Sequence, residues 1–351
     1  MRMWLLMIAM KKVSLKDIAI RAGVSPTTVS FVLNGKAKDK RISQDVIDRV
    51  EALVKKLDYR PNRMARGLRT GETRTIGLMV EDISNQFFAT LAKVIEDEAV
   101  AYGYEVIYCS TEGNDLRAEK LLRMLKYRQV DGYILTPTTE LETEVRNLIQ
   151  EDKPFVLMDR YFPGLDTAYV VVDNFRGAYM AVTHLVHQQY RKIAIVTTSS
   201  SQLQMQERLR GFRAALKAEG IHHRKTLELS IPFEAAENSA MSRIEDFLVQ
   251  TQPDAVFFST NYLGVYGLEM IRKLGWHMPE RIGMVCFDDH AIFRLYEPAI
   301  TCISQPMDKI GECVIKVLMD EIKSENALQH AQYVLEPALV IRKSCREQGD
   351  R

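Results

Sequence analysis

The sequence has few of the features that mark secreted, membrane-spanning or metal-dependent proteins. Its five cysteines are odd in number and widely scattered, and no His/Cys cluster has the spacing of a metal site. We therefore expect no metal, and reduced thiols in a cytoplasmic protein. No apolar run is long enough to span a membrane, so a membrane partner is not expected.

Motifs for catalysis and cofactor binding are also missing. The sequence contains neither a Walker-type phosphate loop nor the nucleophile elbow of the hydrolases. Its seven histidines are dispersed, and the pair His222 and His223 is typical of a surface loop. These absences predict a protein that has no cofactor and is not an enzyme. An enzyme stays the weaker alternative.

The first ten residues, MRMWLLMIAM, are only partly similar to an export signal. Their apolar run is shorter than a normal signal core, no small-residue cleavage site follows, and Lys11 and Lys12 come at once. We expect residues 1–10 to be a disordered or mis-assigned extension, with Met10 as the alternative start.

Charges of both signs are almost balanced in number but unevenly distributed. The net charge is +1, whereas residues 11–74 hold eight lysines and eight arginines against five aspartates and two glutamates. The rest of the chain is therefore acidic. A basic segment on an acidic body is typical of a nucleic-acid-binding head. A merely solvated basic face is the alternative.

Residues 11–60 have the pattern of a small helical domain. The side chains Leu15, Ile18, Ala19 and Ala22 lie on one face of a first helix. Gly23 tolerates a left-handed turn. Ser25 and Pro26 then suit the start of a second helix, and a third is expected from Ser43 to Leu57.

The stretch LKDIAIRAGVSPTTVSFVLNG, from Leu15 to Gly35, predicts a helix-turn-helix. Its second helix would lie in the major groove of double-stranded DNA with its early residues at base edges. The expected base contacts are Thr27, Thr28 and Phe31, and the expected phosphate contacts are Ser25, Ser30 and Asn34. A plain three-helix bundle is the alternative.

From residue 75 onward, short β-rich runs alternate with amphipathic helices. Strands are expected at 75–80, 105–109, 132–136, 155–158, 169–172, 192–197, 227–231, 255–259 and 282–287. This alternation predicts two doubly wound parallel sheets, because about nine strands are too many for one lobe. We expect one lobe at about 75–160 and another at about 161–290, within a domain of residues 75–344. The chain would cross back near 290 and 320, and a ligand would bind between the lobes, where strands end.

The segments SLKDIAIRAGVSPTTVSFVLNG and YRPNRMARGLRTGETRTIGL make a family likeness plain. The chain resembles the lac repressor/galactose repressor family of bacterial regulators from about Val13 to Lys343. The runs NGKAKDKRIS, RQVDG and FDDH are most similar to the fructose and sucrose regulators. The resemblance implies a small all-α helix-turn-helix head plus an α/β two-lobed domain like the periplasmic binding proteins.

The resemblance also assigns a role to residues 61–74, which composition alone reads as a linker. In this family the segment folds into a short hinge helix on the operator, and its leucine, here Leu68, enters a minor-groove step. Asn62 would cap that helix, and Arg66 and Arg69 would accompany it. Paired hinges imply a homodimer on a near-palindromic operator.

The family binds small effectors between its lobes, and the matching positions here are polar or aromatic. They are Phe87, Phe88, Asp159, Arg160, Arg208, Asn261 and Asp288. Carboxylates accept hydrogen bonds from sugar hydroxyls, and arginine donates to hydroxyl pairs or to a phosphate. Each residue also has an alternative, purely structural role, such as a helix cap or an ion pair. Tyr262 departs from the family, in which that position is often acidic.

The function implied is that of a repressor controlled by a sugar or sugar phosphate. The presence of both Arg160 and Arg208 among these positions suggests the hypothesis that the effector is a phosphorylated sugar. No leucine heptad follows the last apolar run, Pro337–Ser344, so a dimer is expected and not a tetramer. The second hypothesis is an exported sugar-binding protein of similar fold.

Overall fold

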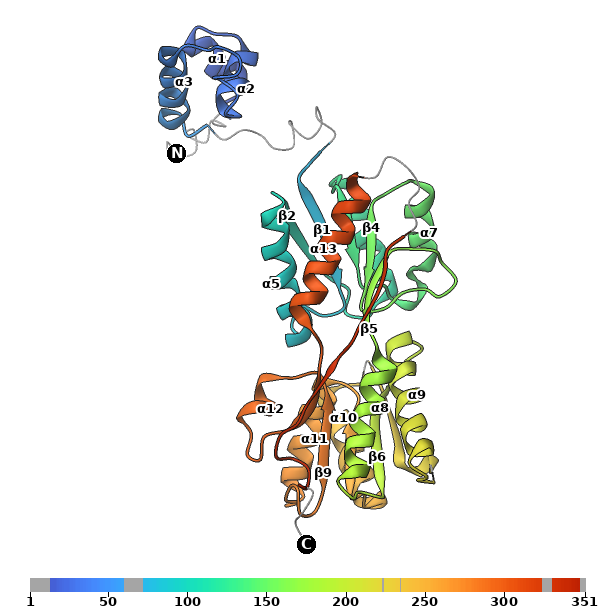
Figure 1. Cartoon of the computed structure of the whole chain (residues 1–351). Coiled ribbons are helices and arrows are strands. Elements are labelled where there is room, and N and C mark those ends of the chain that lie inside the picture. The colour runs from blue at the N-terminus through green and yellow to red at the C-terminus, as the bar shows by residue number, and fades with distance from the viewer. Residues whose placement is uncertain (1–12, 60–71, 223, 234, 324–329, 348–351) are drawn as a thin grey trace, which may run out of the picture. The chain divides into compact units, whose positions relative to one another are not determined.

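The computed structural model describes residues 13–59, 72–222, 224–233, 235–323 and 330–347. The chain divides into two compact units, residues 1–73 and 74–351. Figure 1 shows the helices and strands of each unit. The expected extension at residues 1–10 lies outside the described residues.

The first unit, the head, consists of three helices in its described part. They are α1 (Leu15–Ala22), α2 (Pro26–Leu33) and α3 (Gln44–Lys56). Their apolar faces meet in a core that includes Ile18, Ala22, Val29 and Val50, all of them buried. The helical periodicity of the sequence thus produces a packed bundle.

The first lobe of the second unit is built on a sheet with the order β11-β5-β4-β3-β1-β2, and all its pairings are parallel. Its strands are β1 (Thr75–Val80), β2 (Glu105–Ser110), β3 (Gly132–Leu135), β4 (Phe155–Met158), β5 (Tyr169–Val172) and β11 (Gln332–Leu335). Helices α5 (Gln86–Ala101) and α13 (Met307–Lys323) contribute to one core cluster, and α6 (Asp115–Tyr127) and α7 (Glu142–Gln150) to another. A short helix, η1 (Thr139–Leu141), precedes α7.

The second lobe repeats this plan with the strand order β12-β10-β9-β8-β6-β7. Its strands are β6 (Ile193–Ser199), β7 (Glu228–Pro232), β8 (Ala255–Phe258), β9 (Gly283–Phe287), β10 (Thr301–Ser304) and β12 (Ala338–Val340). Its helices are α8 (Asn174–His187), α9 (Leu203–Ala218), η2 (Lys225–Leu227), α10 (Glu237–Thr251), α11 (Asn261–Lys273) and α12 (Ala291–Leu295). The edge strand β12 runs antiparallel to β10, so this sheet is not wholly parallel as expected.

The chain passes between the lobes at three places that differ from the expected ones. The predicted boundary near 160 is wrong, because β5 pairs with β4 and β11 in the first sheet and the chain leaves that lobe only at residue 173. The predicted crossing near 290 is also wrong, because α12 and β10 still belong to the second lobe and the chain crosses at 305–306. The return expected near 320 occurs at 336–337, after β11. The first error arises because the predicted strand at 169–172 was assigned to the second lobe, and the other two arise because β10, β11 and β12 were not predicted.

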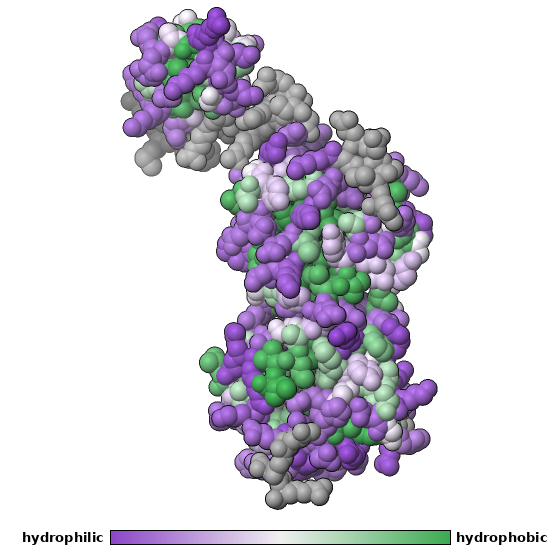
Figure 2. All heavy atoms as spheres, viewed as in Figure 1, coloured by the Kyte–Doolittle hydropathy of each residue, from purple (hydrophilic) through white to green (hydrophobic). Residues whose placement is uncertain are grey.

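Hydrophilic residues cover much of the surface seen in Figure 2, and apolar atoms gather in smaller areas, one of them on the second lobe. No helix in the described part of the chain is long and apolar enough to cross a membrane.

Candidate DNA-binding head and ligand cleft

The helix-turn-helix is held by caps that the sequence encodes. Ser14 and Asp17 form a reciprocal capping box at the start of α1. Gly23 ends that helix with a φ of +68°, a backbone conformation that favours glycine. Ser25 caps α2 by accepting a hydrogen bond from the Thr28 amide at 3.0 Å, as the sequence predicts. These caps fix where α2 begins relative to α1.

The residues predicted to contact DNA lie on or beside α2. Thr27 is exposed, and Thr28 and Phe31 are partly exposed. The Ser25 hydroxyl lies 2.9 Å from the Thr28 hydroxyl, and the Asn34 side-chain amide donates to the Ser30 carbonyl oxygen at 2.6 Å. The side chains of Ser25 and Asn34 therefore already have local partners within the head.

The rest of the predicted DNA interface lies outside the described residues. These positions are Asn62, Arg66, Leu68 and Arg69, which belong to the expected hinge.

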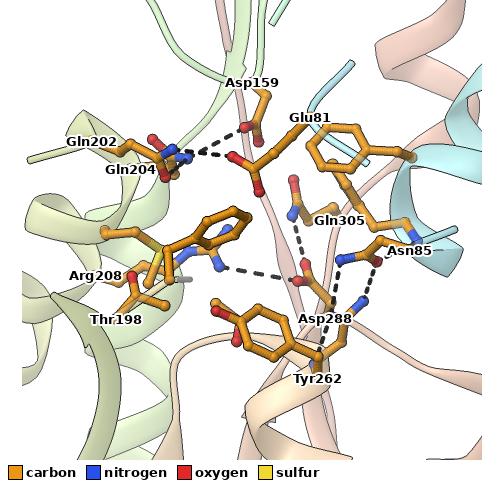
Figure 3. A pocket seen from close by; sticks show the side chains of 16 residues that line it. Glu81, Asn85, Asp159, Thr198, Gln202, Gln204, Arg208, Tyr262, Asp288 and Gln305 are labelled. Atoms are coloured by element: carbon orange, nitrogen blue, oxygen red, sulfur yellow. Dashed lines mark hydrogen bonds and ion pairs between the residues drawn. The ribbon is translucent and has the colours of Figure 1, made fainter. Parts of the chain in front are cut away.

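A cleft opens where strand ends of the two lobes approach each other. Figure 3 shows side chains from both lobes pointing into it. It is lined by Glu81, Asn85, Phe87, Phe88, Asp159, Thr198, Gln202, Gln204, Met205, Arg208, Phe233, Thr260, Asn261, Tyr262, Asp288 and Gln305. Six of the seven predicted effector residues are in this lining, and Arg160 is not.

The two predicted aspartates occupy equivalent places in the two lobes. Asp159 directly follows β4, and Asp288 directly follows β9. Both have a positive φ, +70° and +73°, which aspartate tolerates better than most side chains. Burial raises the pKa of Asp159 to about 6, although Arg160 and Arg208 oppose the shift. Burial also raises the pKa of Asp288, against the opposing effect of Arg208.

Arg208, on α9, is buried and fully engaged within the second lobe. Its Nε donates to Asn174 Oδ1 at 2.8 Å and its Nη1 to the Ser259 carbonyl oxygen at 2.6 Å. The guanidinium lies 3.6 Å from the ring centroid of Phe287 and 4.0 Å from Asp288 Oδ2. Burial lowers the pKa of Arg208, whereas Asp288 raises it. The outcome is a rigid donor at the cleft wall.

Arg160 is also buried, but its bonding is incomplete. Its Nη2 lies 2.5 Å from Glu81 Oε2, and its Nε lies 3.8 Å from Asp159 Oδ2. Among the described residues, Nε and Nη1 of Arg160 have no hydrogen-bond partner. Buried donors without partners are costly, so Arg160 is less completely bonded than Arg208.

Several cleft residues were not predicted from the sequence. They are Glu81, Asn85, Gln202, Gln204, Tyr262 and Gln305, besides less polar neighbours. Glu81 directly follows β1, so the expectation that a ligand binds where strands end could have indicated it. Gln305 follows the unpredicted strand β10 and donates to Asp288 Oδ1 at 2.6 Å. The others lie at helix starts, where sequence carries a weaker signal.

Hydrogen bonds connect the lobes across the cleft. Gln202 and Gln204 of the second lobe donate to Glu81 at 3.0 Å and to Asp159 at 3.4 Å, as Figure 3 shows. Asn261 donates to Asn85 at 2.8 Å, with a longer reciprocal contact at 3.4 Å. The lobes thus share a polar interface at the site.

Two family descriptions match the chain. Residues 14–62 match bacterial regulatory proteins of the lacI family, and residues 182–345 match a periplasmic binding protein-like domain. A regulatory head on this domain disfavours the hypothesis of an exported sugar-binding protein.

Curated relatives match over nearly the whole chain. The HTH-type transcriptional repressor PurR of Photobacterium profundum is 31% identical over 339 residues, covering 95% of this chain and 99% of that protein. The ribose operon repressor of Escherichia coli (strain K12) is 31% identical over 335 residues, covering 94% of this chain and 99% of that repressor. These relatives are repressors and not enzymes.

Solved structures also match nearly the whole chain. A complex of the transcriptional regulator CelR with cellobiose is 27% identical with a TM-score of 0.70, covering 95% of this chain and 99% of that one. The lac repressor dimer bound to operator and the anti-inducer ONPF has a TM-score of 0.84 at 22% identity, covering 96% of this chain and 100% of that one, and supports the fold. The predicted family and fold class are confirmed: this chain belongs to the LacI family of bacterial regulatory proteins, with a helix-turn-helix head and a two-lobed periplasmic-binding-protein-like domain.

Proposed function

We propose that this chain is a cytoplasmic transcriptional repressor whose affinity for operator DNA is set by a small sugar or sugar phosphate bound in the cleft. One observation carries the proposal: a single chain joins a helix-turn-helix head to a two-lobed domain whose strand ends collect carboxylates, guanidiniums and amides around one cleft. The protein binds its effector without converting it and uses no cofactor.

DNA recognition is assigned to α2. Thr27, Thr28 and Phe31 contact base edges, because they are exposed or partly exposed on the helix that enters the major groove. Ser25, Ser30 and Asn34 contact phosphates. The hinge residues Asn62, Arg66, Leu68 and Arg69 are proposed to bind the minor groove beside them.

The active form is proposed to be a homodimer on a near-palindromic operator, because two heads related by a twofold axis read two half-sites. Val100, Tyr108 and Leu295 are apolar or aromatic side chains that are exposed in the single chain and available for contacts between copies.

The coupling is proposed to act through relative movement of the lobes. Effector binding changes the bonds between Gln202, Gln204 and the carboxylates opposite them, which shifts the first lobe and the hinge attached to it. A coupling free energy of about 1–3 kcal/mol corresponds to a change in DNA affinity of roughly 5–150-fold.

The test begins with the full-length protein and a pool of random DNA duplexes, from which bound sequences are selected. We expect a near-palindrome to be enriched, and Thr27→Ala to weaken binding to it by about 1–3 kcal/mol. Glu51→Ala, at an exposed position of α3, is the matched control and leaves affinity nearly unchanged. Equal binding of that duplex by a chain lacking residues 1–70 would refute the proposal.

A further inference from the structure

The charges that surround the cleft do not balance. The cavity lining holds three carboxylates, Glu81, Asp159 and Asp288, and one guanidinium, Arg208, and no other charged side chain among the described residues. Arg160 is buried outside the lining, where it supplies a second guanidinium in contact with Glu81. Arg294 lines the adjoining cavity, but it is exposed, where water and salt screen its charge. With all five groups ionised, the cleft carries a formal charge of −1.

Both guanidiniums, moreover, are already neutralised. Arg208 lies 4.0 Å from Asp288 and donates to two further oxygens of its own lobe. Arg160 lies against Glu81 at 2.5 Å. Glu81 is held in place from the other lobe by Gln202, whose amide donates to the same carboxylate at 3.0 Å. An entering anion would have to displace Glu81 or lie among three carboxylates.

Hydroxyl groups face no such obstacle. A neutral hydroxyl donates to a carboxylate and accepts from a guanidinium, so one polyol can satisfy both kinds of group. The three carboxylates in the lining can accept hydrogen bonds from such hydroxyls, and Arg160, buried outside the lining, keeps Nε and Nη1 without a hydrogen-bond partner in the described part of the chain. Phe87 and Phe88, with ring centroids 4.9 Å apart, provide an apolar wall for the C–H face of a sugar ring.

We infer that the cleft selects an uncharged polyhydroxylated compound over its phosphorylated form, and that Glu81 sets this selectivity by occupying the guanidinium of Arg160. The inference rests on the proposed function only in treating the cleft as a ligand site. It replaces the sequence-based hypothesis of a phosphorylated sugar, which counted the arginines without the carboxylate paired with one of them.

The experiment uses the full-length protein, with ligand binding followed by melting temperature and calorimetry at pH 7.5 in chloride buffer. The probes are inorganic phosphate and two matched pairs, D-ribose with ribose 5-phosphate and D-fructose with fructose 1-phosphate. Four proteins are compared: wild type, Glu81→Gln, Asp159→Asn and Glu119→Gln. The last is a control that makes the same change in net charge on α6, at the partly exposed Glu119, whose ion-pair partner is Arg123.

We expect Glu81→Gln to bind inorganic phosphate at least tenfold more tightly than the wild type and the control do. Tenfold corresponds to about 1.4 kcal/mol. Phosphate bound by the basic head is common to all four proteins and cancels in this comparison. Where a neutral sugar of the panel binds the wild type, its phosphate ester is expected to bind at least tenfold more weakly.

Two results would overturn the inference. One is a wild-type protein that binds a phosphate ester as tightly as the matching neutral sugar. The other is a folded Glu81→Gln variant with no gain in phosphate affinity. If that variant does not fold, Asp159→Asn takes its place, because it also removes one carboxylate from the cleft. DNA binding is measured in a separate experiment. The inference about ligand selectivity can therefore fail while the proposed repressor function stands, and the repressor function can fail while the selectivity is confirmed.

Discussion

The two lobes present the same arrangement to the cleft but use it differently. In each, a buried strand ends at an aspartate with positive φ, Asp159 in the first lobe and Asp288 in the second. In the second lobe, Arg208 has hydrogen-bond partners of its own lobe and Gln305 donates to Asp288. In the first lobe, Arg160 keeps two N–H groups without partners and the carboxylates take bonds from the other lobe.

This difference indicates a division of labour within the site. In the second lobe the guanidinium of Arg208 is held within its own lobe, although Thr198 Oγ1, Gln204 Oε1 and Thr260 Oγ1 lack hydrogen-bond partners among the described residues. In the first lobe it is the guanidinium of Arg160 that is incompletely bonded, and its carboxylates take bonds from across the cleft. Ligand binding and lobe movement are therefore expected to act mainly on the first lobe. Substitutions that exchange or remove these features test the comparison.

The largest effect is expected from the two arginines. Arg208→Met should lower the free energy of unfolding by about 3–5 kcal/mol, because it leaves Asp288 buried without its cation and also frees the oxygens of Asn174 and Ser259. Arg160→Met also leaves Glu81 without its cation, but no further hydrogen bond is lost and two unpartnered buried nitrogens are removed, so its cost should be smaller, about 2–3 kcal/mol. Urea unfolding measures both.

Arg210→Met is the control for the arginine pair, since Arg210 lies on the same helix as Arg208 but is exposed, where it pairs with Glu207 and lies 4.2 Å from the ring centroid of Phe175. It should change stability by less than about 1 kcal/mol. Equal losses for Arg208→Met and Arg160→Met would contradict the division between the lobes.

A second, smaller effect is expected from substitution of the aspartates, which should raise the free energy of unfolding where substitution of the arginines lowers it. The pKa of Asp159 is raised from the ordinary value of 3.8 to about 6 in the folded protein, so stability is lost as the pH rises from about 4 to 6. Asp159→Asn removes that cost and should stabilise the ligand-free protein by about 2–3 kcal/mol at pH 7.5. Well below pH 3.8 the wild-type carboxyl is protonated in both states, so the gain should vanish. Melting curves from about pH 3 to 8 measure this.

Asp288→Asn provides the comparison within the same experiment. Asp288 has Arg208 and Gln305 in place, and these partners favour its ionised form against burial. Its substitution should therefore stabilise the protein less than Asp159→Asn does. A larger gain from Asp288→Asn would mean that the second lobe is the strained one.

Much of this architecture follows from local patterns in the sequence. β4 and β5 were predicted with the bounds they have, since each is a short, mostly buried apolar run between polar segments. Gly23 and Ser25 determined the helix-turn-helix through backbone conformation and capping. The family resemblance identified Asp159 and Asp288, and both directly follow a strand, where a ligand was expected. In such cases the residues that determine the local structure all lie within one short segment of the sequence.

The sequence was less informative where pairing is decided by distant segments. β11 and β12 are short and largely unburied, and they are strands only because β5 and β10 offer free edges. Missing them displaced the predicted lobe boundaries. The pairing of Glu81 with Arg160 joins residues 79 positions apart, and no local pattern indicates it. The charge balance of the cleft can therefore be seen only in the structure.

The smallest effect is expected from Asn85 and Asn261, which occupy similar helix-start positions in the two lobes. Asn85 caps α5 by accepting from the Phe87 amide at 3.0 Å, Asn261 accepts from the Tyr262 amide at 2.7 Å, and the two side chains bond each other across the cleft. Asn85→Ala and Asn261→Ala should each cost about 1 kcal/mol through the lost helix-end bond. The double variant should cost less than the sum by about 0.5 kcal/mol, because the inter-lobe bond is lost only once. Strict additivity in urea unfolding would mean that the bond contributes nothing to holding the lobes together, and that other inter-lobe bonds, such as those of Gln202, Gln204 and the Ala291 amide, connect them.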